Sequence, residues 1–350
     1  YAVYEFENPI ADDPTHPYGA DFIVYGNAFW NNSEAGCIQV SKDGATWYDI
    51  AGSMYYTKST KGASITYTNP STSEDAGITA AGTNLGTLAP VNYTLNGTAG
   101  TVTTNTFHNH SWFPLNANYF AASGSRAAMA KLDEFSFVSR TLASNGVTDK
   151  LTFTGTLLTD YPGTGKTDQI GFGYCDVHPN KTLGGTIAYN PYQTFTSSSD
   201  YDTKVAGTSG GDPIDIAWAV KSNGTPANLD SIRYVRIYTG MAQMNGIFGE
   251  ISTEVCGVAA CTGSTTETAA TPTISVDGST VTTTNGGILP LSKKSGDYTV
   301  NVTGTGYVYI NGVATTSATI TPTRTGTKVQ IIVQNGEAAP YVTYLNLQKK

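Results

Sequence analysis

Short apolar runs separated by turn dipeptides dominate the hydropathy pattern of this chain. Residues 273–350 contain four Asx-Gly pairs, at 277–278, 285–286, 311–312 and 335–336. Such pairs supply the positive φ angles that tight hairpins need. The runs between them are rich in Val, Ile and Tyr and alternate only in part, which is typical of strands. The pattern therefore predicts a small β-sandwich of about six strands here.

The first 262 residues give the same signal. Residues 21–25 (DFIVY) form a continuous apolar run that suits a buried central strand, and residues 37–50 predict a hairpin around Asp43-Gly44. Further strands are expected in four other runs: 1–6, 151–155, 215–220 and 232–238. Trp47 and Trp218 lie within these strand patterns and are expected in the core. Residues 125–135 predict one short helix.

A change of composition divides the chain. Residues 263–272 (GSTTETAATP) are small, polar and without periodicity, which is the composition of a linker. We therefore expect a large domain at 1–262 and a small one at 273–350. Residues 55–120 and 176–212 are long and polar, and loops of that length are usually functional or insertions.

Composition narrows the class of protein. Only 13% of the residues are charged, against 38 glycines and 22 tyrosines, and the net charge is −8. Nucleic-acid binding needs clustered Lys and Arg, which the chain lacks, and no apolar run is long enough to span a membrane. The chain begins inside a predicted strand without a signal peptide, so we expect a processed form of a longer exported precursor.

Four cysteines indicate an oxidising compartment. In a helix-poor chain rich in Thr and Gly, an even number of cysteines favours disulfides, and four allow three pairings. Cys256 with Cys261 would close a short loop and leave Cys37 with Cys175. The alternative is that these are reduced, buried thiols.

Several segments resemble known families. Residues 37–52 resemble the V-x-S-x-D-G-x-x-W hairpin of discoidin-like, galactose-binding-like jelly rolls, and residues 229–238 resemble a late strand of the same domains. A closer resemblance, to a largely uncharacterised family of bacterial cell-surface proteins, is carried by four blocks: 18–29, 171–177, 212–220 and 249–255.

These resemblances imply a fold and a location. The expected fold is all-β: a jelly-roll-type β-sandwich with long loop insertions, followed by a small immunoglobulin-like or cadherin-like β-sandwich. The family implies export and a place at the bacterial cell surface, and it brings no reaction and no catalytic residues.

Galactose-binding-like jelly rolls often hold one structural calcium ion, so the resemblance also implies a Ca²⁺ site. Calcium takes six to eight oxygen ligands, and acidic or amide side chains lie at the edges of the family-like blocks: Asp12, Asp13, Asp21, Asn27, Glu34, Glu250 and Glu254. Asp21, Asn27, Glu250 and Glu254 are the candidate ligands. The alternative is that they form hydrogen bonds within turns.

Aromatic residues in polar segments are candidates for ligand binding. They are Trp30, Trp112, Tyr119, Tyr189 and Tyr192. An aromatic ring beside amides suits the apolar face of a sugar. Such residues also serve as lids over a sandwich core, and this alternative stays open.

No motif of a nucleophile elbow, zincin helix or phosphate loop is present, so no enzymatic activity is expected. Two functions remain. The first is adhesion or binding of a glycan or matrix component through loops of the jelly roll. The second is a self-assembling subunit of an extracellular filament or surface layer, joined to other copies through its terminal strands.

Overall fold

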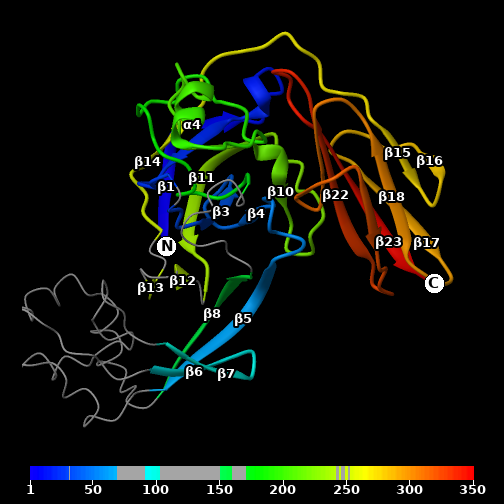
Figure 1. The fold of residues 1–350 in the computed structure, drawn as a ribbon, viewed down its shortest axis with the longest axis horizontal. Helices are drawn as coiled ribbons and strands as arrows, with labels where there is room; N and C mark the ends of the chain where they lie inside the picture. Colours follow the sequence, from blue (N-terminus) through cyan, green and yellow to red (C-terminus); the bar gives the residue numbers. More distant parts are fainter. Residues whose placement is uncertain are drawn as a thin grey trace, which may run out of the picture. The chain divides into compact units, whose positions relative to one another are not determined.

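Strands make up nearly all of the regular structure, as the apolar runs predict (Figure 1). The computed structural model describes residues 1–30, 32–68, 91–102, 150–159, 171–241, 244–245, 249–250 and 253–350. The chain forms two units: residues 1–59, 158–240 and 252–350 belong to unit 1, and residues 60–157 and 241–251 to unit 2. The predicted class, an all-β sandwich, is therefore confirmed.

Unit 1 begins with a sandwich of a five-stranded and a three-stranded sheet. The first sheet has the order β1 (Ala2–Ala11), β11 (Ser231–Thr239), β3 (Gly36–Ser41), β4 (Tyr48–Ile50) and β10 (Ala219–Val220). The second has the order β14 (Gly257–Ala260), β2 (Phe22–Tyr25) and β9 (Asp212–Ile214). All four residues of β2 are buried, as their apolar run predicts. Ile and Val side chains from both sheets meet in one core.

A second sandwich follows in residues 273–350. One sheet has the order β16 (Ser279–Val281), β15 (Thr273–Val276), β18 (Tyr298–Thr303) and β21 (Ser317–Ile320). The other has the order β17 (Ile288–Lys293), β23 (Tyr341–Lys349), β22 (Thr327–Gln334), β19 (Tyr307–Ile310) and β20 (Val313–Ala314). Two of the four turn pairs act as predicted: Asp277 and Asn311 adopt φ angles of 50° and 52°, each followed by a glycine of positive φ. In the pairs at 285–286 and 335–336 only the glycine has a positive φ.

The sheet that contains β22 is buried on both faces. Alternate side chains of a strand point to opposite faces. Val329, Ile331 and Val333 face the core of the second sandwich, whereas Ile332 belongs to the core of the first. Tyr309 on β19 also belongs to the first core, as do Val342 and Tyr344 on β23. The two sandwiches therefore share one sheet within unit 1, although the sequence predicts a linker between them.

Tyr309 connects the two cores directly. Its hydroxyl donates a hydrogen bond to the carbonyl oxygen of Tyr192 at 2.9 Å. Its ring lies edge-on to Phe172, with centroids 5.2 Å apart, and Phe172 packs against Trp218 at 4.9 Å. Trp218 is fully buried, as predicted.

Two predictions in the first sandwich are wrong. Residues 215–220 are not one strand, because the Asp215 carboxylate accepts the Ala217 N–H at 2.7 Å and starts the 3₁₀ helix η5 (Ile216–Trp218). Trp47 is only half-buried. It lies outside the core. The Arg236 guanidinium carbon lies over the Trp47 ring, 4.2 Å from the ring centroid.

The two terminal strands occupy different places in their sheets. β23 pairs with β22 on one side and with β17, in parallel, on the other. β1 pairs with β11 and lies at the end of its sheet order. Both terminal strands were predicted as joints between copies. β23 is paired on both sides within its own sheet, whereas β1 is an edge strand of its sheet among the described strands.

Unit 2 contains a four-stranded sheet in the order β7 (Thr98–Val102), β6 (Val91–Leu95), β5 (Ser59–Thr68) and β8 (Lys150–Leu158). Unit 2 also contains a separate antiparallel pair of strands, β12 (Met244–Asn245) and β13 (Gly249–Glu250). Part of the polar stretch at 55–120 therefore forms strands. The helix predicted at 125–135 lies outside the described residues.

The shared core makes a testable prediction about Tyr309. Replacing it with Ala leaves a cavity between the cores, and we expect the free energy of unfolding to fall by about 3–5 kcal/mol. Tyr309→Phe removes only the hydrogen bond and should cost about 1 kcal/mol. Urea denaturation followed by fluorescence measures both.

The matched control is Tyr307→Ala, on the same strand, where the side chain is 36% exposed. We expect it to change stability by less than about 0.5 kcal/mol. Equal stability of Tyr309→Ala and Tyr307→Ala would contradict a shared core.

Candidate functional site

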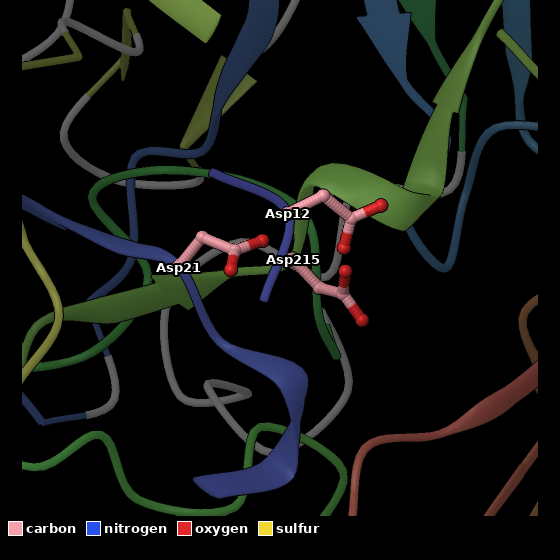
Figure 2. A group of neighbouring side chains, drawn as sticks. All are labelled: Asp12, Asp21 and Asp215. Carbon is pink, nitrogen blue, oxygen red and sulfur yellow. The ribbon is translucent and has the colours of Figure 1, made fainter. Parts of the chain in front are cut away.

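Three aspartates from separate segments meet in unit 1 and form what we call the aspartate cluster: Asp12, Asp21 and Asp215 (Figure 2). Asp12 follows β1, Asp21 precedes β2, and Asp215 follows β9. Pairing of β2 with β9 brings the last two together, because the Asp21 N–H donates to the Ile214 carbonyl at 2.9 Å. One carboxylate oxygen from each residue lies within 4.8 Å of the others.

The three carboxylates differ in the number of hydrogen bonds that they accept from the protein. Asp21 is fully buried and accepts hydrogen bonds from the backbone N–H groups of Asp13 (3.0 Å) and Ile216 (2.9 Å). His16 Nδ1 lies 3.1 Å from the same carboxylate. Asp215 accepts the Ala217 N–H through Oδ1. The Asp12 carboxylate accepts no hydrogen bond from the described residues.

A pocket of about 430 Å³ opens beside this cluster. Asp12, Asp215 and Asp230 contribute carboxylates to its wall, and Pro14 and Leu229 contribute apolar surface. Further lining residues come from the second sandwich: Asn285, Gly286, Ala339 and Pro340. A pocket of this volume lies within the range of sites for small molecules and ions.

Burial and mutual repulsion make these carboxyl groups hard to ionise. Burial raises the pKa of Asp12 to about 7, and repulsion from Asp21 and Asp13 adds to the rise. Burial, with repulsion from Asp21 and Asp12, raises the pKa of Asp215 well above its ordinary value. Burial also raises the pKa of Asp21, although the bond to His16 opposes it. A bound cation would relieve this repulsion.

A second group of acids, the Glu34 cluster, consists of Glu34, Asp176 and Glu254. Asp176 is fully buried and has a φ angle of 59°. Its Oδ1 accepts the Asn27 N–H at 2.8 Å and its Oδ2 accepts the Glu254 N–H at 3.0 Å. Burial raises the pKa of Asp176 to about 7. Asp176 thus joins the loop after β2 to the segment that leads into β14.

Two oxygens near the Glu34 cluster are buried without a hydrogen-bond partner among the described residues. One is Glu254 Oε2, within the cluster. The other is Asn180 Oδ1, whose side chain donates from Nδ2 to the Gly26 carbonyl at 2.6 Å. Gly26 packs so closely on Asp176 that a Cβ atom would lie 2.1 Å from its Oδ1. Buried oxygens that lack a donor are the groups that a cation satisfies.

The structure separates two of the predicted calcium ligands within unit 1. Asp21 belongs to the aspartate cluster, and Glu254 to the Glu34 cluster. Asn27 reaches the Glu34 cluster only through its backbone N–H. Glu250 lies in unit 2. Asp21 and Glu254 therefore fall in different clusters of unit 1, because their positions at loop edges do not show which loops meet.

Sequence reasoning missed Asp176 and Asp215 altogether. Asp215 was assigned to a strand, and Asp176 was seen only as part of a family-like block. Both lie where the chain turns sharply: Asp176 has a positive φ and Asp215 caps a 3₁₀ helix. An aspartate at a predicted turn could have indicated these residues as candidate ligands. Aspartate is equally common at turns because its side chain accepts hydrogen bonds from the turn itself, without any ligand.

The predicted ligand-binding aromatics separate into three classes. Tyr189 and Tyr192 are 3% and 1% exposed, so they pack in the protein and offer no face to a ligand. Trp30 is half-buried against Phe195 and Tyr201, with centroids 6.4 and 6.2 Å away. Trp112 and Tyr119 lie outside the described residues. The packing alternative therefore holds for Tyr189 and Tyr192.

The disulfide predictions are wrong in the structure, where all four cysteines are thiols. Cys175 pairs across a bridge with Gly36 and joins the core of the first sandwich. Cys37, next to Gly36, points to the opposite face. Cys256 and Cys261 lie at the two ends of the extended strand β14, roughly 16 Å apart at the rise of a strand, which is too far for a disulfide.

The raised pKa of Asp12 predicts a pH dependence of stability. The pKa is 3.8 in the unfolded chain and about 7 in the folded protein, so the folded state binds more protons between these values. The free energy of unfolding should therefore fall as the pH rises toward 7, by at most about 1.4 kcal/mol per pH unit per group. Asp12→Asn should make this slope shallower in urea denaturation at pH 5 and pH 7 with chelator present.

Asp43→Asn is the control. Four hydrogen bonds, first those from the Thr46 and Ala45 N–H groups, hold the pKa of this exposed carboxyl at about 2. Asp43 is therefore ionised at both pH values, and its removal should leave the difference in stability unchanged. An unaltered slope in Asp12→Asn would contradict the electrostatic description of the cluster.

No protein-family model matches the chain, and no curated protein matches it. No helix within the described ranges is long and apolar enough to cross a membrane. The functional assignment therefore rests on the two carboxylate clusters and the loops beside them.

Proposed function

We propose that this is an exported bacterial cell-surface protein without catalytic activity, which binds a glycan or matrix component through loops of its first sandwich. The observation that carries the proposal is the Glu34 cluster. Three acidic side chains lie together there, and one buried oxygen, Glu254 Oε2, has no hydrogen-bond partner in the part of the chain that the structure describes. A structural calcium ion at this cluster would satisfy both the charge and the oxygen.

A calcium site would also be informative about the compartment in which the protein works. Extracellular modules commonly bind calcium with dissociation constants of about 10⁻⁴–10⁻³ M, weaker than the cytosolic sensors do. A site built from three carboxylates, without a contiguous binding loop, fits that class. This supports an extracellular or cell-surface location, in agreement with the acidic, Tyr-rich and Thr-rich composition.

The binding surface is proposed at residues 26–30 and 32–35. Phe29 is 71% exposed there, and the neighbouring Asn27 side chain is exposed as well. A ring beside an amide suits recognition of a sugar. The same loop supplies Glu34 and donates the Asn27 N–H to Asp176. Calcium at the Glu34 cluster would therefore order the loop that displays Phe29.

Calcium should raise the midpoint of thermal unfolding. At a calcium concentration of about 100 times the dissociation constant, one site adds about 2.7 kcal/mol, which corresponds to roughly 5–10 °C in a domain of this size. Glu254→Gln should lose most of this shift in differential scanning fluorimetry. Asp277→Asn, an exposed acid in the second sandwich, should keep it.

Binding is tested with a glycan array, with and without calcium. Phe29→Ala should abolish any signal, whereas Tyr307→Ala, also an exposed aromatic, should retain it. Incubation with each bound polysaccharide should release no reducing sugar. Release of sugar would contradict the proposal, and so would glycan binding that requires neither calcium nor the Phe29 side chain.

One observation supports a second candidate, a self-assembling filament or layer subunit. β1 is ten residues long and ends its sheet, and Tyr1 and Val3 are 89% and 47% exposed. A strand from another copy can pair with such an edge. If so, negative-stain electron microscopy should show filaments that Val3→Lys removes. Leu183→Lys, at a loop residue that is 66% exposed, should not affect them.

A further inference from the structure

We propose that the pair Asn335-Gly336 is a site of covalent self-modification, at which the Asn335 side chain loses ammonia and becomes a carboxylate. The pair lies in the turn that joins β22 to β23. The inference goes beyond the function proposed above, because it involves neither of the acidic clusters nor the loop that displays Phe29. It stands on a comparison of the five Asn-Gly pairs that lie wholly within the described residues.

The reaction needs only the chain and water. The Gly336 backbone nitrogen attacks Asn335 Cγ, and its proton passes through water to the side-chain amide group. That group leaves as ammonia when the bond between Cγ and Nδ2 breaks. Water then opens the cyclic succinimide at either carbonyl, which yields aspartate or isoaspartate. Glycine has no side chain to crowd the attacking nitrogen, and asparagine is a thermolabile residue.

Four of the five pairs hold the asparagine amide in a hydrogen bond with a backbone N–H. Asn96 Oδ1 accepts the N–H of Ser64, Asn223 Oδ1 that of Thr225, Asn285 Oδ1 that of Val342 and Asn311 Oδ1 that of Gln330. In the pairs at 223–224 and 285–286 the glycine N–H is also bonded, to a backbone carbonyl. These hydrogen bonds must break before the nitrogen can reach Cγ, which slows the reaction.

The pair Asn335-Gly336 is open at both reacting groups. Asn335 is exposed, and its amide forms no hydrogen bond with a described residue. The Gly336 N–H likewise donates to no described residue. Gly336 has a φ angle of 60°, in the region that favours glycine, so the turn calls for the residue that makes the pair reactive. The other four described pairs lack this combination.

The product changes a turn that is bonded to two distant segments. Gly336 packs on Glu267, since a Cβ atom would lie 2.0 Å from its Oε2. The same Oε2 accepts the Glu337 N–H at 2.8 Å, and the Glu337 carbonyl accepts the Tyr18 N–H. A carboxylate at residue 335 adds a negative charge next to these two glutamates, and isoaspartate also lengthens the backbone. Modification should therefore loosen the turn.

Peptide mass spectrometry of the full chain, incubated at 37 °C and at pH 6 or pH 8, tests the site. We expect conversion of Asn335 to aspartate and isoaspartate at least about tenfold faster than that of Asn223 or Asn311. It should be faster at pH 8, because base removes the proton of the attacking nitrogen. Asn223 is the matched control, since it is also exposed and also precedes glycine. In the urea-unfolded chain, where no hydrogen bond protects an amide, the three sites should convert at similar rates.

Equal conversion of Asn335 and Asn223 in the folded chain would overturn the inference. So would an intact Asn335 in the folded chain under conditions in which the unfolded chain reacts. Asn335→Asp carries the charge of the product and tests its effect on the turn. Hydrogen exchange in the peptide 335–340 should be faster in Asn335→Asp than in Asn335→Gln, which keeps an uncharged amide. Equal exchange in the two variants would show that the charge does not loosen the turn.

Discussion

The fold of unit 1 depends on a sheet that is buried on both faces. β22 places Val329, Ile331 and Val333 in one core and Ile332 in the other, so the hydrophobic effect acts across both of its faces. Two buried glutamines lie on the same strand. Gln334 donates to the carbonyls of Gly336 and Ala338 and accepts from Asn190 at 2.8 Å. Gln330 donates to the Ala51 carbonyl and the Tyr344 hydroxyl, but its Oε1 is buried without a hydrogen-bond partner among the described residues.

The pocket is a consequence of that shared sheet. Because β22 and β23 pack against the first sandwich, the turns at Asn285-Gly286 and Ala339-Pro340 come close to Asp12 and Asp215. Hydrogen bonds hold the turns there: the Tyr18 N–H donates to the Glu337 carbonyl at 2.8 Å, and Asn285 accepts the Val342 N–H at 2.8 Å. The carboxylates are buried by elements that lie far apart in the chain, which is why their ionisation is coupled to the packing of the two sandwiches.

Periodicity and turn chemistry predicted the strands at 1–6, 21–25, 37–50, 151–155 and 232–238, because both signals are local. The run at 21–25, the hairpin at 37–50 and the Asx-Gly turns are each decided by neighbouring residues. The shared sheet could not be predicted in this way, although four of the five residues of the run VQIIV at 329–333 are apolar. A linker composition at 263–272 describes how the chain behaves locally, and it does not exclude packing of the segments that it joins. The candidate sites depend on the same non-local contacts: Asp21 and Glu254 were found from their loops, but their partners Asp215 and Asp176 come from segments brought together across the fold.

The positions of the two clusters follow from one physical constraint. Loops at the ends of a sandwich must satisfy their backbone N–H groups, and Asp21, Asp176 and Asp215 do so for five donors in all. Each such carboxylate is then held close to the core, where ionisation is expensive. When two or three of them converge, turn hydrogen bonds no longer balance the charge, and a proton or a cation must. The same side chains that close the loops of this sandwich are therefore the ones whose ionisation the fold makes costly.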